Sequence, residues 1–171
     1  QTATLPRTST VVTADRCRDA FLPGEATSAH RHGPEGEHSH TGTASTTWLD
    51  LKLAACQAEH VRDSLLGKLP DRSNVIRKES ESLANDLAAL DASMREAAAS
   101  LGDAPVFASH PVYQYLDDAY GLDIYSFHFE PDEELDAEGL AAVDTARKTH
   151  PAALMLWEAE PLPATRRSLE D

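Results

Sequence analysis

The chain has 171 residues, of which 41% are hydrophobic and 26% charged, and its formal net charge is -14. This length suits one domain with a single core. The balance of 29 acidic against 15 basic residues excludes a nucleic-acid surface, which needs clustered Lys and Arg. No apolar run reaches the roughly 20 residues of a membrane helix. Neither a secretion signal nor an initiator Met is present, so we expect a piece of a longer protein.

The amino-terminal segment begins with β-branched residues and leads into a tract rich in histidine. Thr8–Thr13 predicts a short strand, and a turn at Pro23-Gly24 opens a flexible loop over residues 24–46. Half of the eight histidines lie in this loop, interleaved with two glutamates: His30, His32, His38 and His40, with Glu35 and Glu37. Imidazole and carboxylate suit zinc and its neighbours in the first transition series, so the loop is a candidate metal-capturing tract, the alternative being a polar loop without a role.

Two helices are predicted after the loop. Apolar residues at helical spacing run from Thr47 to about Leu66, where Gly67 and Pro70 end the pattern. A seam with heptad-like spacing then runs from Ser73 to Leu101 and stops at Gly102. A helix of that length spans on the order of 40 Å, more than a small domain is wide, so we expect a spine that braces a bilobed protein.

Strands and helices alternate over the rest of the chain. Strands are predicted at Val106–Ser109, Ile124–Phe129 and Ala153–Trp157, and helices at Val112–Tyr120, at Asp132–Thr149 and from Pro163. This order predicts an α/β fold, with a mainly parallel sheet of about four strands flanked by helices and one long backbone helix. We expect one structural domain, in which 1–23 connects into the lobe, 24–46 is the loop, and 47–171 comprises a helical linker (47–101) and an α/β lobe (102–171).

Cys17 and Cys56 permit one disulfide but do not require it. Cys56 falls on the apolar stripe of the first predicted helix, where a buried free thiol is the favoured interpretation. The pairing of the two cysteines stays open at the level of sequence.

His110 is the strongest single candidate for a functional side chain. It follows the first strand of the αβ series directly, and ligands of parallel sheets collect at the carboxyl ends of the strands. Glu158 and Glu160 follow the third strand and are candidates for the same cleft. The remaining histidines have structural interpretations: His128, between two phenylalanines, packs in a core or an interface, while His60 and His150 support the fold.

Several segments together resemble the metal-binding solute-binding proteins of bacterial ABC transporters, the zinc and manganese uptake class. Thr46-Thr47-Trp48-Leu49-Asp50 is similar to that family's His-x-Trp-Leu-Asp segment, and Ser73–Leu101 to its interlobe backbone helix. The strand–His–Pro–aromatic segment of the family is matched by 106–116, and its later turns by Glu130-Pro131 and 157–161. The similarity covers residues 38–171.

The resemblance implies one lobe of a bilobed metal receptor, the carboxy-terminal lobe plus the interlobe helix. The family's ligand in the strand–His–Pro segment carries over to His110. Its His before Trp-Leu-Asp does not carry over, because Thr46 stands there, so either His38 and His40 supply the missing imidazole or the metal binds differently or poorly. The family's first His and its late carboxylate have no counterparts in this chain, so weak metal binding is expected.

The function implied is that of a periplasmic solute-binding component of a zinc or manganese ABC importer. It captures the ion and delivers it to an inner-membrane permease, acts as a monomer, and is not an enzyme. The expected metal ligands are His110, then His38 and His40, with His30 and His32 as loop ligands. Two alternatives remain: a zinc hydrolase with Glu158 or Glu160 as general base, and a stand-alone metal buffer in which only the loop matters. No phosphate loop, nucleophile elbow or His-Glu-x-x-His motif supports catalysis.

Overall fold

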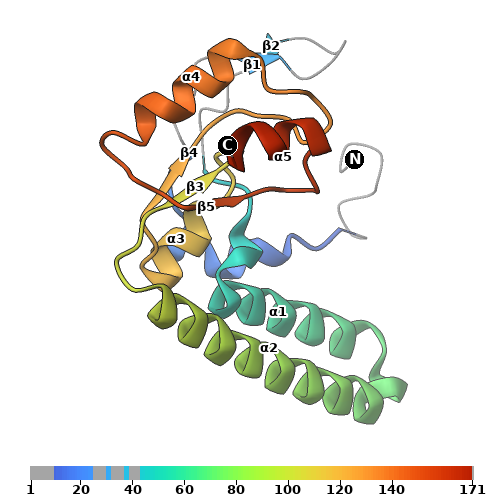
Figure 1. The fold of residues 1–171 in the computed structure, drawn as a ribbon. Coiled ribbons are helices and arrows are strands. Elements are labelled where there is room, and N and C mark those ends of the chain that lie inside the picture. The colour runs from blue at the N-terminus through green and yellow to red at the C-terminus, as the bar shows by residue number, and fades with distance from the viewer. Residues whose placement is uncertain (1–9, 25–29, 32–36, 39–42, 171) are drawn as a thin grey trace.

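The structure is a computed structural model that describes residues 10–24, 30–31, 37–38 and 43–170. A three-stranded sheet with helices on both sides stands on a long helical hairpin (Figure 1). The elements, in chain order, are a 3-10 helix at Thr13–Ala20, β1 (His30–Arg31), β2 (Glu37–His38), a 3-10 turn at Thr47–Leu49, α1 (Leu51–Lys68), a 3-10 turn at Pro70–Arg72, α2 (Ser73–Leu101), β3 (Val106–Ala108), α3 (Gln114–Tyr120), β4 (Ile124–Ser126), α4 (Ala137–Ala146), β5 (Leu154–Leu156) and α5 (Pro163–Glu170).

The sheet is parallel, with β3 in the centre between β4 and β5. Phe107 of β3 pairs with Tyr125 of β4 on one side and with Met155 of β5 on the other. β3 is buried along its whole length because helices and loops cover both faces of a central parallel strand. The predicted α/β class with a parallel sheet is confirmed, although the sheet of the described residues has three strands where about four were expected.

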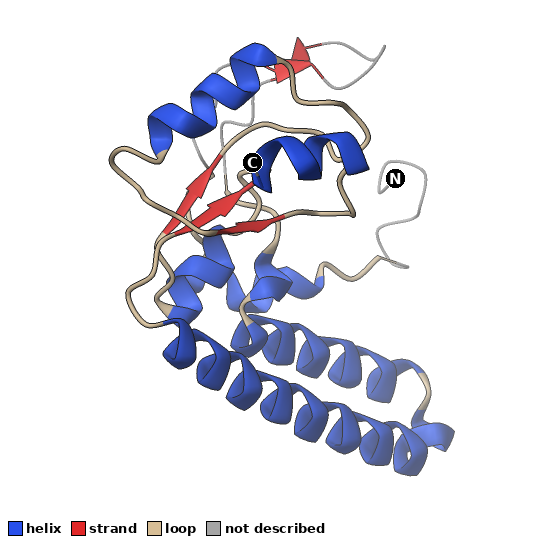
Figure 2. Ribbon diagram, in the orientation of Figure 1, coloured by secondary structure: helices blue, strands red, loops and turns tan. Residues whose placement is uncertain are grey.

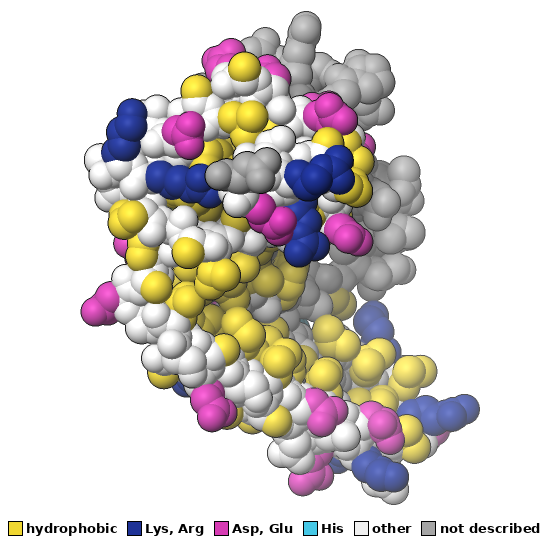
Figure 3. Space-filling view, in the orientation of Figure 1, with side chains coloured by type: hydrophobic (Ala, Val, Ile, Leu, Met, Phe, Trp, Pro, Cys, Tyr) yellow, Lys and Arg dark blue, Asp and Glu magenta, His cyan; other side chains and the backbone are white. Residues whose placement is uncertain are grey.

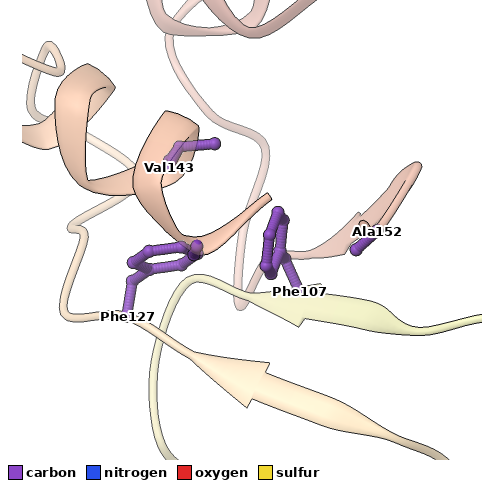
Figure 4. Packing of buried hydrophobic residues seen from close by; sticks show 5 residues of the cluster. Phe107, Phe127, Val143 and Ala152 are labelled. Atoms are coloured by element: carbon purple, nitrogen blue, oxygen red, sulfur yellow. The ribbon is translucent and has the colours of Figure 1, made fainter. Parts of the chain in front are cut away.

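The main core lies between the sheet and α4. Phe107 and Phe127 meet edge to face, with ring centroids 5.1 Å apart, and Val143 of α4 packs against them. Figure 4 shows these side chains and Ala152 converging between the strands and the helix. On the other side of the sheet, α3 places Tyr115 in a second core with Leu53 of α1. These two cores hold the carboxyl ends of the strands in fixed positions.

Helices α1 and α2 form an antiparallel hairpin (Figure 2). The Asp50 side chain caps α1 by accepting a hydrogen bond of 2.8 Å from the Lys52 backbone. Helix α2 spans Ser73–Leu101 as predicted and ends where Gly102 adopts a φ of 61°, a conformation that favours glycine. No residue of α2 is buried, and the apolar residues Val75, Leu83 and Leu90 are about half exposed. On the face seen in Figure 3, hydrophobic side chains gather between the hairpin and the sheet layer.

The amino-terminal segment differs from its predicted strand. Residues 10–12 belong to no strand, Thr13–Ala20 forms a 3-10 helix, and residues 8–9 lie outside the described part. Val11 and Val12 are exposed, so the β-branched pattern had no sheet to join. The helix packs on α1, where Arg16 Nη1 donates to Asp63 at 2.7 Å.

Cys17 and Cys56 form a disulfide, so the free-thiol interpretation of Cys56 is wrong. The prediction that Cys56 lies on the apolar side of its helix is confirmed, because the bridge lies in the core that contains Leu53 and Tyr115. The bridge closes a segment with a sequence separation of 39, which stabilises the fold by roughly 3–4 kcal/mol through the lost entropy of the unfolded chain.

The predicted helices and strands of the α/β region are all present, with shorter bounds. The long helix predicted at Asp132–Thr149 covers only Ala137–Ala146, because the residues before Asp136 form a turn and Asp136 caps the helix through Gly139. The strand predicted as far as Phe129 ends at Ser126. Among the described residues, no helix is long and apolar enough to cross a membrane.

Candidate metal centre

His110 lies at the carboxyl edge of the sheet, two residues beyond the end of β3. The backbone around it is fixed to both neighbouring strands, since Ser109 N donates to Leu156 O and Phe129 N donates to Ser109 O, each at 2.8 Å. Only 6% of His110 is exposed. The predicted placement of His110 at this edge is therefore found in the structure, with a ring that has little freedom to move.

Two carboxylates flank the His110 ring. Glu130 Oε1 lies 3.7 Å from Nε2, and Glu158 Oε2 lies 3.6 Å from Nδ1. The two glutamates follow β4 and β5, so all three strands deliver a polar side chain to the same edge, as parallel sheets do. Of the two predicted candidates for this cleft, Glu158 lies beside His110, and Glu160, two residues later, is exposed like Glu158 but is not among the carboxylates that flank the ring. Glu130 was predicted only as part of a turn; its position directly after the second predicted strand was the signal that could have placed it at this edge.

His128 also reaches this edge and is exposed, so its prediction as a core histidine is wrong, while the interface alternative stays a prediction. Its ring lies edge to face with that of His110, with centroids 5.6 Å apart. The chain continues beside the β3 segment beyond Ser126, since Phe127 N donates to Ala108 O and Phe129 N donates to Ser109 O. His128 therefore faces the opposite side from the two phenylalanines. The prediction that His128 points away from its phenylalanine neighbours was correct, but that direction leads to His110.

Aromatic and hydroxyl groups lie close to the same edge. Burial, followed by the charge of Glu158, raises the pKa of Tyr113 above the ordinary tyrosine value. Thr46, which stands where a histidine was expected from the resemblance, donates its hydroxyl to the Val112 carbonyl, two residues from His110. The segment before α1 is therefore tied directly to the segment that carries His110.

The loop histidines are described in part. β1 and β2 pair antiparallel, with His30 opposite His38 and Arg31 opposite Glu37. His32 and His40 lie outside the described residues, as do the side chains of His30 and His38. The expected contribution of these four residues to a metal site stays a prediction.

The two remaining histidines support the fold, as predicted. His60 Nδ1 lies 3.1 Å from the Thr13 carbonyl and so links α1 to the amino-terminal 3-10 helix. His150 Nε2 lies 3.1 Å from the Val106 carbonyl, and its ring packs against Phe107 and Tyr125. His60 is thus held by a backbone carbonyl, and His150 by a backbone carbonyl and two aromatic rings, so both side chains link elements of the fold.

The arrangement around His110 offers nitrogen and oxygen donors of the types that zinc binds. As they stand, the side chains in the described part of the chain include no group of three or more His, Cys, Asp or Glu arranged to hold a metal ion. His110 is therefore a buried donor with charged neighbours, and a bound ion requires further donors to move towards it.

The chain is similar to known zinc-uptake and zinc-binding proteins. The family model described as zinc-uptake complex component A, periplasmic, matches residues 3–170. A zinc-binding lipoprotein, AdcA of Streptococcus pneumoniae, is 30% identical over 141 residues. That match covers 81% of this chain and 28% of AdcA, so the chain spans less than a third of that protein.

Solved structures show the same fold. The Zn(II)-bound ZnuA-like domain of Streptococcus pneumoniae AdcA superposes with a TM-score of 0.68 at 26% identity, over 75% of this chain and 48% of that one. The periplasmic zinc-binding protein TroA of Treponema pallidum superposes with a TM-score of 0.67 at 18% identity, over 94% of this chain and 56% of TroA.

The family whose model matches is one of binding proteins and not of enzymes, so the zinc-hydrolase alternative is wrong. The match over nearly the whole chain, together with the parallel sheet and the histidine at its edge, shows that the chain belongs to the ZnuA family of metal-binding solute-binding proteins.

Proposed function

We propose that this chain belongs to the periplasmic solute-binding component of an ABC importer for zinc, or for manganese. The protein captures the ion outside the inner membrane and delivers it to a membrane permease. It acts as a monomer and does no chemistry on the ion. The names of its relatives, a zinc-binding lipoprotein and a periplasmic zinc-binding protein, support zinc as the ion.

The observation that carries this proposal is the position of His110. A buried imidazole at the carboxyl edge of a parallel sheet, held between Glu130 and Glu158, is a preorganised donor for a divalent cation. Because the backbone on either side is bonded to both neighbouring strands, little entropy is lost when the ring binds an ion. His110 is therefore proposed as a ligand that this lobe contributes to the site.

The domain organisation proposed from sequence agrees with this function. Residues 47–101 form the helical linker and 102–171 the α/β lobe, with 1–23 as the connection and 24–46 as the His-rich loop. The chain spans about half the length of the solved relatives, which is consistent with a carboxy-terminal lobe and its interlobe helix. A second lobe would supply the remaining ligands.

The His-rich loop is proposed to capture ions before they reach His110. The antiparallel pairing of His30 with His38 places two histidine positions opposite each other in the backbone ladder. His32 and His40 alternate with these positions in sequence and complete the proposed loop ligands, and His38 and His40 are the nearest in sequence to Thr46. If the loop alone mattered, the protein would be a metal buffer instead.

The test is a calorimetric titration of the chain with Zn²⁺, compared with its His110→Ala variant. The variant should bind zinc at least about tenfold more weakly at the lobe site, since the loss of even an outer-shell partner costs roughly 10–100-fold in metal affinity. His60→Ala is the matched control, because it removes an imidazole that lies on α1 and contacts Thr13. Unchanged zinc affinity in His110→Ala would remove the proposed cleft site.

A further inference from the structure

The segment after β4, residues 127–130, places aromatic side chains on one side and polar side chains on the other. Phe127 is buried, and Phe129 stacks on it with ring centroids 4.7 Å apart. Both belong to the core under α4. Successive side chains of an extended chain point to opposite sides, so His128 and Glu130 face away from that core. The two phenylalanines therefore hold a histidine and a glutamate on the side where the sheet carries His110.

The distances place the side chains of both His128 and Glu130 beside that of His110. Glu130 Oε1 is 3.7 Å from His110 Nε2, and the ring of His128 stands edge to face against the His110 ring, with centroids 5.6 Å apart. His128 is exposed while His110 is buried. An ion arriving from solvent would thus meet an exposed imidazole first and a buried imidazole behind it.

These distances are close to those of a zinc site. With Zn–N and Zn–O bonds near 2.0–2.1 Å, two donors on a tetrahedral zinc lie about 3.3 Å apart, and two bound imidazoles have centroids roughly 5 Å apart. Small side-chain movements of Glu130 and His128 are enough to reach both values. The side chains that must move are the two exposed or half-exposed ones, and the buried His110 stays in place.

We infer that His128 and Glu130 bind the metal ion together with His110, in a site built within the α/β lobe. This inference rests on the proposed function and specifies the ligands of the same site. The imidazole of His128 takes the place of the one that is missing at Thr46, so the lobe retains two imidazoles and a carboxylate. Glu158 is a positioning residue: its Oε2 lies 3.6 Å from Nδ1, and a small approach would let it accept a hydrogen bond from that nitrogen when Nε2 binds the metal.

The experiment titrates the chain with Zn²⁺ by calorimetry, and with Co²⁺ by visible absorption, for His128→Ala and Glu130→Gln. Each variant should bind Zn²⁺ more than about tenfold more weakly. The Co²⁺ band should lose intensity in both, because tetrahedral coordination is lost with a ligand. Glu158→Gln should weaken binding but keep the shape of the Co²⁺ spectrum, since a positioning residue does not touch the metal.

Two control variants match these changes. Glu134→Gln removes an exposed carboxylate from the same segment, and His60→Ala removes an imidazole far from the sheet edge; both should bind like the unaltered chain. If His128→Ala lowers the melting temperature, His128→Gln keeps a polar side chain of similar size and tests the same ligand.

The outcomes separate this inference from the proposed function. If His110→Ala loses zinc while His128→Ala and Glu130→Gln bind normally, the ligand assignment is overturned and the function stands. If His110→Ala also binds normally, the proposed cleft site and the ligand assignment are overturned together.

Discussion

Thr46 is the residue that departs most plainly from the pattern of the resembled family. Its hydroxyl donates to the Val112 carbonyl, so it bridges the segment before α1 and the segment after His110. Hydrogen bonds of this kind contribute about 1 kcal/mol to stability. Thr46 thus has a structural role in this chain. It is bonded to the segment that carries His110, although it offers no imidazole to a metal ion.

Thr46→His should restore a metal ligand at this position. The new imidazole would stand beside the segment that carries His110, and we expect zinc affinity to rise at least about tenfold, since each added ligand of good geometry contributes 1.4 kcal/mol or more. The measurement is a competition titration with a chromogenic zinc chelator. The lost hydroxyl bond should lower the melting temperature by a few degrees.

Thr46→Val is the control for this change, because it removes the hydroxyl without adding a donor. It should reproduce the loss of stability and leave zinc affinity unaltered. Equal affinities of Thr46→His and Thr46→Val would show that this position no longer faces the ion.

At the scale of elements, the contact between α2 and α3 ties the hairpin to the sheet layer. The Tyr120 hydroxyl donates to Asp91 Oδ1 at 3.0 Å, and Arg95 binds the same carboxylate and lies over the Tyr120 ring. The Arg95 guanidinium, followed by the Tyr120 hydroxyl, lowers the pKa of Asp91 despite the opposing effect of burial. Burial and the hydrogen bond to Asp91 raise the pKa of Tyr120 to about 12.

Tyr120→Phe should remove a pH dependence from this contact. A phenol with a raised pKa binds its proton more tightly in the folded chain, so its stabilising effect is complete below about pH 10, the ordinary tyrosine value. The effect is lost as the pH rises towards 12. Urea unfolding should show the variant about 1 kcal/mol less stable at pH 8, with the difference shrinking above pH 10.

Tyr125→Phe provides the comparison, because Tyr125 is exposed on β4 and Phe retains its ring contacts. This control should follow the unaltered chain at every pH. A constant difference between Tyr120→Phe and the unaltered chain from pH 8 to pH 12 would contradict the role assigned to the hydroxyl.

At the scale of the whole molecule, the His-rich loop and the sheet edge are two separate proposed metal sites. The first lies between residues 24 and 46, and the second gathers residues from three strands around His110. Pro23 and Thr43 form a backbone bridge at the base of the loop. The ends of the loop are thus close together, and its removal should leave the lobe intact.

Deletion of residues 28–42 should lower the number of zinc ions bound while one site at His110 remains. This expectation follows from the bridge at the base of the loop and from the disulfide between Cys17 and Cys56, which both lie outside the deletion. Calorimetry gives the stoichiometry, and circular dichroism checks the fold. Loss of all zinc binding would instead identify the loop as a metal buffer.

The hairpin of α1 and α2 exposes an apolar face. Helix α2 buries no residue, and α1 and α2 together expose large apolar side chains, among them Val61, Leu65, Val75, Leu83 and Leu90. Figure 3 shows hydrophobic side chains continuing from the hairpin towards the sheet layer.

The sequence by itself determined the elements whose signals are local. The bounds of α2 followed from its seam and from Gly102, and the αβ order predicted the parallel sheet with His110 at its edge. Local signals suffice there because periodicity, helix-ending glycines and strand order act over a few residues.

Contacts between distant segments were decided only by the tertiary structure. The Cys17–Cys56 bridge, the exposure of the segment predicted as a first strand, and the turn of His128 towards His110 all depend on which segments meet. Glu130 shows the reason most clearly: its sequence neighbours identify a turn, and only the alignment of β4 beside β3 brings its carboxylate to the His110 ring.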